Sequence, residues 1–405
     1  MPFGRPYHGR VSNNSQSRGA APHNPAREPG RVHWMELFFD LIFVAFVSQL
    51  AHGIHGDPGP AAFGSYVLLF FPAWWAWVNM VSVINVLPGL SARTLGLAML
   101  AAMAAAGVMA AAAPGALGDR AWAFSLGNAA LRAVLLVLWL HHDRHTVSGT
   151  SWRIWIYNGG TAALWLVSAV LPLHVAVVLW GAAIAVEIAM VLLSAHLWPE
   201  RGAANINIEH ASERLGLFVI IVLGESVVTI VNEVSAHWGP GPALGGALGF
   251  LVVALLGWSF FQYGAGTVAP GLERLRSRAD FGGILQTTLF LPFLLVLGVT
   301  SVAAGIATAI SAPYDRLPLG AGISLGGGLA LYYGTNALVS LRYGQPPRRV
   351  VPWAGPTVVL ALLLIPLSAL VPAAALLAAA TALLMLATAY VELVRRRRPA
   401  GPGAP

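Results

Sequence analysis

Apolar stretches long enough to cross a lipid bilayer recur along almost the whole chain. A transmembrane helix needs about 20 mostly apolar residues. Twelve stretches of the 405-residue sequence meet this requirement: 34–54, 63–87, 92–113, 120–141, 153–171, 173–197, 211–236, 243–263, 284–310, 319–342, 354–371 and 372–394. Only 10% of the residues are charged, whereas a soluble domain carries about 25%. The sequence therefore predicts an all-α polytopic membrane protein with about twelve transmembrane helices. Only LVPA marks the boundary of the last two stretches, so one long kinked helix is an open alternative there.

The arginines indicate how these helices are oriented. If the amino terminus is cytoplasmic, nearly all arginines between the spans fall on the inner side, and only Arg120 and Arg316 fall outside. Cytoplasmic loops carry an excess of positive charge. The lack of lysine and the richness in Ala, Gly and Leu are typical of a GC-rich bacterial genome. We therefore expect a multi-pass protein of the bacterial plasma membrane with both termini cytoplasmic: a disordered tail at 1–32 and a basic tail at 395–405.

Composition also excludes several classes of function. The net charge of +7 does not indicate nucleic-acid binding, because the arginines lie in loops and tails and no soluble domain presents a basic face. The absence of cysteine excludes disulfides and thiolate chemistry. HHDRH at 141–145 has the spacing of a zinc site, but it lies at a span end, where such side chains meet water and headgroups. We expect no metal and no cofactor, and no residue can be named as catalytic.

The chain has features of an internal duplication. The spans at 34–54 and 211–236 both start on the inner side and open with an acid, Glu36 and Glu213. Each is followed by a Gly/Pro-rich turn and then by an aromatic-rich span, with WWAW at 74–77 and WSFFQY at 258–263. Many transporters are built from such repeats. The pattern favours two parallel six-helix repeats, at 33–200 and 201–394.

The first span, WMELFFDLIFV, carries two acids. Glu36 and Asp40 are four residues apart and share one helical face. Glu36, like Glu213, is expected in the first helical turn, where the helix dipole favours an acid. Asp40 lies about 9 Å deeper than Trp34, at 1.5 Å of rise per residue. A helix-packing hydrogen bond and a role in a polar seam shared with the seventh span are both open for Asp40.

Three further charged residues fall near mid-depth: Arg132, Glu187 and Glu225. An isolated charge there costs at least about 2.5 kcal/mol, so these side chains should face the bundle interior and pair. Arg132 is expected to pair with Glu187 or Glu225. The pair could be purely structural, or it could line an aqueous path or bind a substrate.

Two stretches of sequence resemble a known family. WMELFFDLIFVAFVSQLAH at 34–52 and EHASERLGLFVIIVLGESVV at 209–228 resemble signatures of the bacterial low-temperature-requirement A (LtrA) family, and the resemblance covers roughly 31–394. The family name refers to growth in the cold and not to a biochemical activity. The motif positions carried over are Glu36, Asp40, Glu209, Glu213, Arg214, Glu225 and Ser226. Relatives often have an aromatic-Asp pattern in the eighth span, whereas this chain has WSFFQYG.

A weaker resemblance joins the first span to potassium/proton channels with an F-S-D signature. Those channels are built from six-helix repeats whose first helices line the pore. Here Phe39 replaces the signature serine, and the second repeat, opening at ERLGLF (213–218), lacks the aspartate.

Three kinds of function are compatible with these features. The buried charges favour a transporter or channel for a proton, a cation or a small molecule. An enzyme acting on a lipid or isoprenoid, with carboxylates as general acids, is the alternative. A non-catalytic membrane-adaptation factor is the third. Membrane lipids are the expected partners, together with a homo-oligomeric copy.

Overall fold

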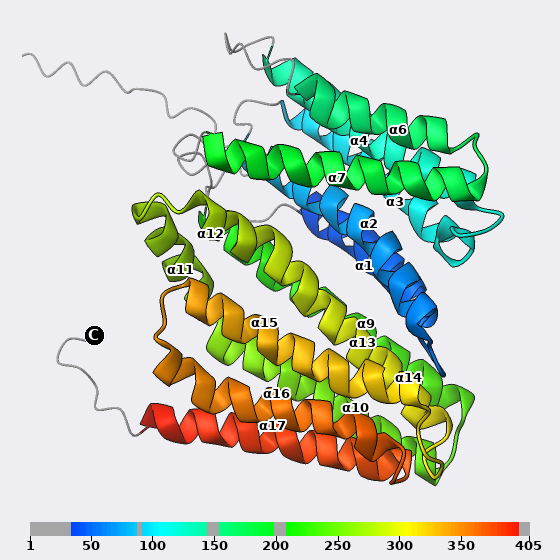
Figure 1. Ribbon diagram of the computed structural model, residues 1–405, viewed down its shortest axis with the longest axis vertical. Helices are drawn as coiled ribbons and strands as arrows, with labels where there is room; N and C mark the ends of the chain where they lie inside the picture. The colour runs from blue at the N-terminus through cyan, green and yellow to red at the C-terminus, as the bar shows by residue number, and fades with distance from the viewer. Residues whose placement is uncertain (1–33, 87–90, 144–153, 198–207, 397–405) are drawn as a thin grey trace, which may run out of the picture.

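The fold consists of long helices joined by short turns (Figure 1). The computed structural model describes residues 34–86, 91–143, 154–197 and 208–396. Within these ranges there is no β-strand; Arg316 and Pro372 form one isolated β-bridge. The predicted tail at 1–32 and residues 397–405 of the predicted basic tail lie outside the described residues, and the last helix continues to Arg396.

In the described residues of the first half, the α-helices are interrupted by one π-helical segment, η3. They are α1 (Trp34–His52), α2 (Pro60–Val86), α3 (Ala92–Ala112), α4 (Ala121–Asp143), η3 (Trp155–Gly160), α6 (Thr161–Ser168) and α7 (Leu173–Leu197). We call the side at which α1 begins the proximal side of the bundle and the opposite side the distal side.

The second half contains three further π-helical segments, η4, η5 and η6, each continuous with an α-helix. Its elements are α9 (Ile208–Ala236), α10 (Pro240–Ser259), η4 (Phe260–Ala265), α11 (Gly266–Ser277), α12 (Phe281–Leu285), η5 (Gln286–Phe290), α13 (Leu291–Ser311), α14 (Leu319–Gly322), η6 (Ile323–Gly327), α15 (Gly328–Arg342), α16 (Pro347–Ser368) and α17 (Ala373–Arg396).

All twelve predicted spans coincide with helical segments, which confirms the all-α polytopic fold. In the described part of the chain, ten helices are long and apolar enough to cross a membrane. The segments at 155–168 and 319–342 are helical but are not among the ten. The last two spans are separate helices, because α16 ends at Ser368 and α17 starts at Ala373 after a turn.

The helices of the two halves pack in the same order. In the first half α1 packs on α3, α3 on α4, α4 on α6, and α6 on α7. In the second half α9 packs on α13, α13 on α15, α15 on α16, and α16 on α17. Figure 1 shows the first half above the second. A duplication would produce this order, but the two repeats stay a prediction, and their boundary near residue 200 lies outside the described residues.

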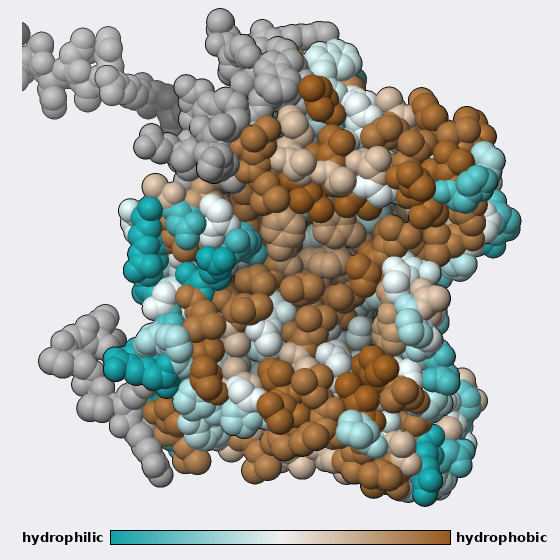
Figure 2. All heavy atoms as spheres, in the orientation of Figure 1, coloured by the Kyte–Doolittle hydropathy of each residue, from teal (hydrophilic) through white to brown (hydrophobic). Residues whose placement is uncertain are grey.

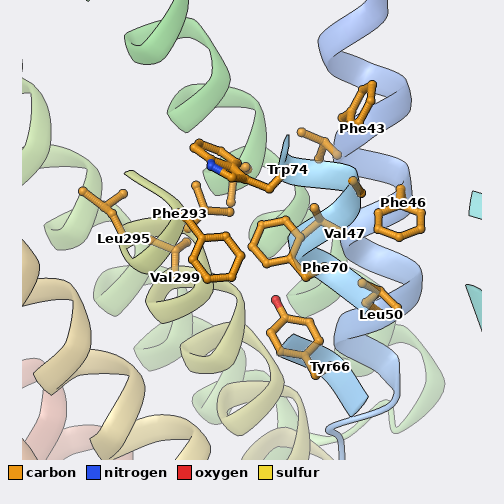
Figure 3. Close-up of a cluster of buried hydrophobic side chains, with 14 of the residues drawn as sticks. Phe43, Phe46, Val47, Leu50, Tyr66, Phe70, Trp74, Phe293, Leu295 and Val299 are labelled. Atoms are coloured by element: carbon orange, nitrogen blue, oxygen red, sulfur yellow. The ribbon is translucent and has the colours of Figure 1, made fainter. Parts of the chain in front are cut away.

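Aromatic side chains of α2 join the two halves. Phe70 stacks on Phe293 of α13 with ring centroids 4.9 Å apart, and the Trp74 indole nitrogen donates to the Leu289 carbonyl at 2.8 Å. Tyr66 is hydrogen-bonded to Thr300. Figure 3 shows Tyr66, Phe70 and Trp74 reaching from α2 into the cluster around Phe293. All of these aromatic side chains are buried, so α2 belongs to the packing of both halves.

Glycines allow α13 and α15 to cross closely. A Cβ atom on Gly298 would lie 2.9 Å from the Gly328 carbonyl oxygen and 3.0 Å from the Tyr332 backbone nitrogen. Those atoms are backbone and cannot move aside. Small residues at such crossings are typical of membrane helices, because they let backbones approach closely.

The surface has the pattern of a protein embedded in a bilayer. Figure 2 shows apolar side chains across the middle of the visible face and hydrophilic ones at the two edges, which are the ends of the helices. Exposed aromatic residues lie near both ends, a pattern typical of the membrane–water interface. They include Trp34 and Trp155 on the proximal side, and Trp122, Trp238 and Tyr314 on the distal side.

Candidate functional site

Glu36 and Asp40 of α1 meet Arg214 of α9 near the proximal ends of these two helices. One Arg214 terminal nitrogen donates to Glu36 Oε2, and the other lies 2.6 Å from Asp40 Oδ1. His210, one turn before Arg214, places Nε2 3.2 Å from Glu36 Oε2. Asp40 and Arg214 are fully buried and Glu36 nearly so. A pair of this kind is costly to break from one side, by about 3–5 kcal/mol, because the remaining charge is left buried.

Trp77 of α2 completes this proximal cluster. Its indole nitrogen donates to Asp40 Oδ1 at 2.7 Å, and its ring lies 5.9 Å from the Arg214 guanidinium carbon. Asp40 Oδ1 therefore has two donors. Among the described residues, Asp40 Oδ2 and Arg214 Nε have no hydrogen-bond partner, although both are buried. One acceptor and one donor remain open, and water or a small polar solute can satisfy such groups.

A second polar contact joins the same two helices closer to the distal side. The Ser48 hydroxyl of α1 donates to Glu225 Oε1 of α9 at 2.5 Å. Glu225 is half-buried. Asp40 and Ser48 are eight residues apart, which is about 12 Å along a helix. Apolar side chains, including Phe43 and Val47, fill this interval on α1. We call the contact between the two helices, from Glu36 to Glu225, the α1–α9 seam.

Arg132 and Glu187 form a separate pair in the first half. Arg132 Nε lies 2.9 Å from Glu187 Oε1, and Nη2 lies 3.2 Å from Oε2, which is a bidentate contact between α4 and α7. Arg132 also donates to the Asn128 side chain at 2.9 Å, and its guanidinium carbon lies 5.3 Å from the Trp165 ring centroid. Of the two predicted partners of Arg132, the structure places Glu187 against it, whereas Glu225 contacts Ser48.

The remaining motif residues lie on α9, with Glu209 and Glu213 near its start and Ser226 further along it. Because this helix begins at Ile208 and not at 211, Glu209 occupies the first turn, and the predicted first-turn position of Glu213 is wrong. Glu209 and Glu213 are both exposed. Ser226 is buried and donates to the Val222 carbonyl of its own helix at 3.0 Å, as a packing residue does.

A chain of hydrogen bonds in the first half was not predicted from the sequence. The Trp75 indole donates to the Tyr157 hydroxyl at 2.9 Å, and that hydroxyl donates to the Asn79 side chain at 2.8 Å. Tyr157 lies in η3, and π-helical segments are frequent at functional sites. Asn79 was noticeable in the sequence as a polar residue inside an apolar span, but nothing local indicated Tyr157 as its partner.

No metal centre is found in the described ranges, where no three His, Asp or Glu side chains come together as a cation would require. Of the HHDRH stretch, His141 lies in the last turn of α4 and is exposed, whereas His145 is outside the described residues.

The fold and its buried ion pairs define a multi-pass, α-helical integral membrane protein. A family model described as bacterial low temperature requirement A protein (LtrA) matches residues 31–390, so the chain belongs to this family. This confirms the resemblance carried by the two motifs. A protein of Rhizobium meliloti (strain 1021) described as uncharacterized is 27% identical over 317 residues, which cover 73% of this chain and 76% of the relative.

Proposed function

We propose that this LtrA-family protein is a transporter or channel whose path follows the α1–α9 seam. The observation that carries the proposal is the buried Asp40–Arg214 pair, which joins the two halves and leaves Asp40 Oδ2 and Arg214 Nε open. Charged residues within transmembrane segments are costly, and they commonly mark substrate and ion pathways. Sites at the contact of two repeats are also typical of transporters.

Glu225 supports a proton or cation as the transported species. It lies 17 residues after the start of α9, about 26 Å along the helix. Its contact with Ser48 supplies a hydroxyl but no positive charge. A half-buried carboxylate at this depth is favourable only if it is protonated or if water or a cation reaches it. In the proposed path, Glu225 is the central site.

The proximal cluster then controls access to that site. Arg214 binds both Glu36 and Asp40, so it holds α1 and α9 together at the end where an ion would enter. Separation of the guanidinium from either acid opens the seam and leaves that carboxylate available to a proton or cation. Because this separation is energetically costly, the state in which Arg214 binds both acids is the closed state of the path. A transported ion changes the relative populations of the closed and open states.

The test is ion flux into liposomes that contain the purified protein, followed with pH-sensitive and potassium-sensitive dyes. E225Q and D40N are the test variants. E233Q is the matched control, because Glu233 lies on the same helix near its distal end and contacts His237 at 3.5 Å. We expect flux in the wild type and in E233Q, and its loss in E225Q and D40N.

Two results would count against the proposal. Unchanged flux in folded E225Q would remove Glu225 from the path. The absence of proton and potassium flux from folded wild-type protein would refute the ion-path proposal and favour organic-substrate transport, lipid chemistry or a non-catalytic role. Product analysis of membrane extracts would then separate the enzyme from the other two.

We also propose that the proximal side faces the cytoplasm of the bacterial plasma membrane. The asymmetric distribution of arginine supports this orientation. The chain has no cysteine, so a single cysteine introduced at the proximal end of the last helix would be the only thiol that a reagent can label. Labelling by a membrane-impermeant thiol reagent in intact cells would contradict the proposed orientation.

A further inference from the structure

The helix that starts at Pro240 is too long for the hydrocarbon core alone. α10, η4 and α11 form one continuous helical run, Pro240–Ser277, of 38 residues. At 1.5 Å per residue this is about 57 Å, compared with about 30 Å for the hydrocarbon core. Since the run begins on the distal side, α11 lies at the proximal membrane surface. Figure 1 shows α11 at the edge of the bundle where α17 ends.

One face of α11 is fixed to the protein and the other faces outward. Val268, Leu272 and Leu275 are buried in a small core with Tyr343, which follows α15. Arg274 and Arg276 are exposed, and Arg278, also exposed, follows the helix end. Figure 2 shows hydrophilic side chains gathered at the edge where Figure 1 draws α11 and α12. α11 therefore presents charge at the level of the lipid headgroups.

Two arginines converge on the turn after α15. Gly344 is exposed and has φ +80°, a conformation that favours glycine. A Cβ atom at this position would lie 3.7 Å from Arg274 Nη1 and 3.6 Å from Arg278 Nη1. One nitrogen of each guanidinium group therefore lies within 4 Å of the same position beside a residue that has no side chain. Like charges held this close repel each other, and an anion between them removes the repulsion.

Neighbouring acids do not neutralise these two groups. Glu273 pairs with Arg276 at 2.7 Å. The Asp280 side chain accepts from the Gly283 backbone nitrogen at 2.8 Å, at the start of α12. The Arg274 side chain donates to the Tyr343 carbonyl, and no described residue accepts a hydrogen bond from the Arg278 guanidinium group. Further exposed arginines surround the turn without acidic partners among the described residues: Arg342, Arg348 and Arg349.

We propose that Arg274 and Arg278, above Gly344, form a binding site for the phosphate group of an anionic phospholipid in the proximal leaflet. The planar guanidinium group matches phosphate geometry and donates two hydrogen bonds at once. The depth of α11 places this phosphate in the headgroup layer, where lipid phosphates are abundant. The bound lipid neutralises the turn between α15 and α16 and attaches it to the membrane.

The test measures lipid binding by the full-length protein in detergent micelles, with phosphatidylglycerol, phosphatidylcholine and inorganic phosphate titrated separately. Thermal stabilisation is the readout, because a ligand that binds the folded state raises the unfolding temperature. R278Q is the principal variant, since Arg274 also holds the Tyr343 carbonyl. R349Q is the matched control, because it removes the same charge from the same surface at a residue that is not among those nearest the Gly344 Cβ position.

We expect saturable stabilisation by phosphatidylglycerol. Its affinity should be at least about tenfold weaker in R278Q, which corresponds to the loss of one charge-assisted hydrogen bond, and little changed in R349Q. R278K keeps the charge and should recover only part of the affinity. Equal weakening in R278Q and R349Q would show diffuse charge attraction and overturn the site. Stabilisation by inorganic phosphate without any by phosphatidylglycerol would overturn the lipid as its ligand.

Discussion

Replacing Arg132 and Glu187 separately and together should distinguish a structural ion pair from part of a path. Both side chains are almost fully buried, and two hydrogen bonds of 2.9 and 3.2 Å join them. In E187M the guanidinium keeps only Asn128 and the Trp165 ring, so an unpaired buried charge remains. We expect E187M and R132M each to lose about 3–5 kcal/mol of unfolding free energy.

The double variant should be more stable than either single variant. Independent losses would sum to about 6–10 kcal/mol, whereas replacing a whole buried pair by apolar residues of similar volume is often neutral or stabilising by about 1–4 kcal/mol. Thermal unfolding in detergent micelles gives the order of stabilities. A double variant no more stable than the less stable single variant would refute the reasoning. If the stable double variant retains ion flux, the pair is structural; if it loses flux, the pair belongs to the path.

Three further predictions follow from single contacts. G298A should lower the free energy of unfolding by about 1–3 kcal/mol, because the added methyl group meets backbone atoms at 2.9 Å. G334A is the control, since a methyl group there meets nothing within 4 Å. Equal midpoints of thermal unfolding in the two variants would contradict this prediction. W77F should cost about 1.5–3 kcal/mol by removing a donor to a charged oxygen of Asp40, and an unchanged midpoint would show that this donor is dispensable. Burial lowers the pKa of His55, between α1 and α2, to about 4. The unfolded chain binds this proton near pH 6.5, so the free energy of unfolding should fall as the pH drops from about 6.5 toward 4. H55Q should reduce that pH dependence.

The span positions could be predicted because each one depends on local composition. An apolar stretch of about 20 residues has few alternatives to a transmembrane helix. Helix ends were less predictable: α9 begins at Ile208, three residues before the apolar stretch, because Glu209 and His210 continue the helix into the proximal surface. The four π-helical segments in the described ranges were not predicted, since they reflect packing between helices and have no local sequence pattern.

The site was predictable as a set of residues but not as a set of contacts. Depth alone limited the partner of Arg132 to Glu187 or Glu225, because all three residues fall at mid-span, and the structure identifies Glu187. The contacts of the proximal cluster could not be predicted, since Arg214 lies 174 residues from Asp40 in sequence and was identified only as a motif position. Trp77 was noticed as part of an aromatic run, and its bond to Asp40 depends on how α2 crosses α1.

The contact between Arg214 and the two acids of α1 makes the two halves chemically different from each other. The first half contributes two carboxylates to the proximal cluster, and the second half contributes the guanidinium that binds them. Two copies of the first half, joined through the same helix, would bring four carboxylates together without a counter-charge. Two copies of the second half would oppose two arginines. Pairing of two like halves is therefore disfavoured, and pairing of the two unlike halves is favoured. The two halves therefore carry complementary charges where they meet, and neither half can take the place of the other in this contact.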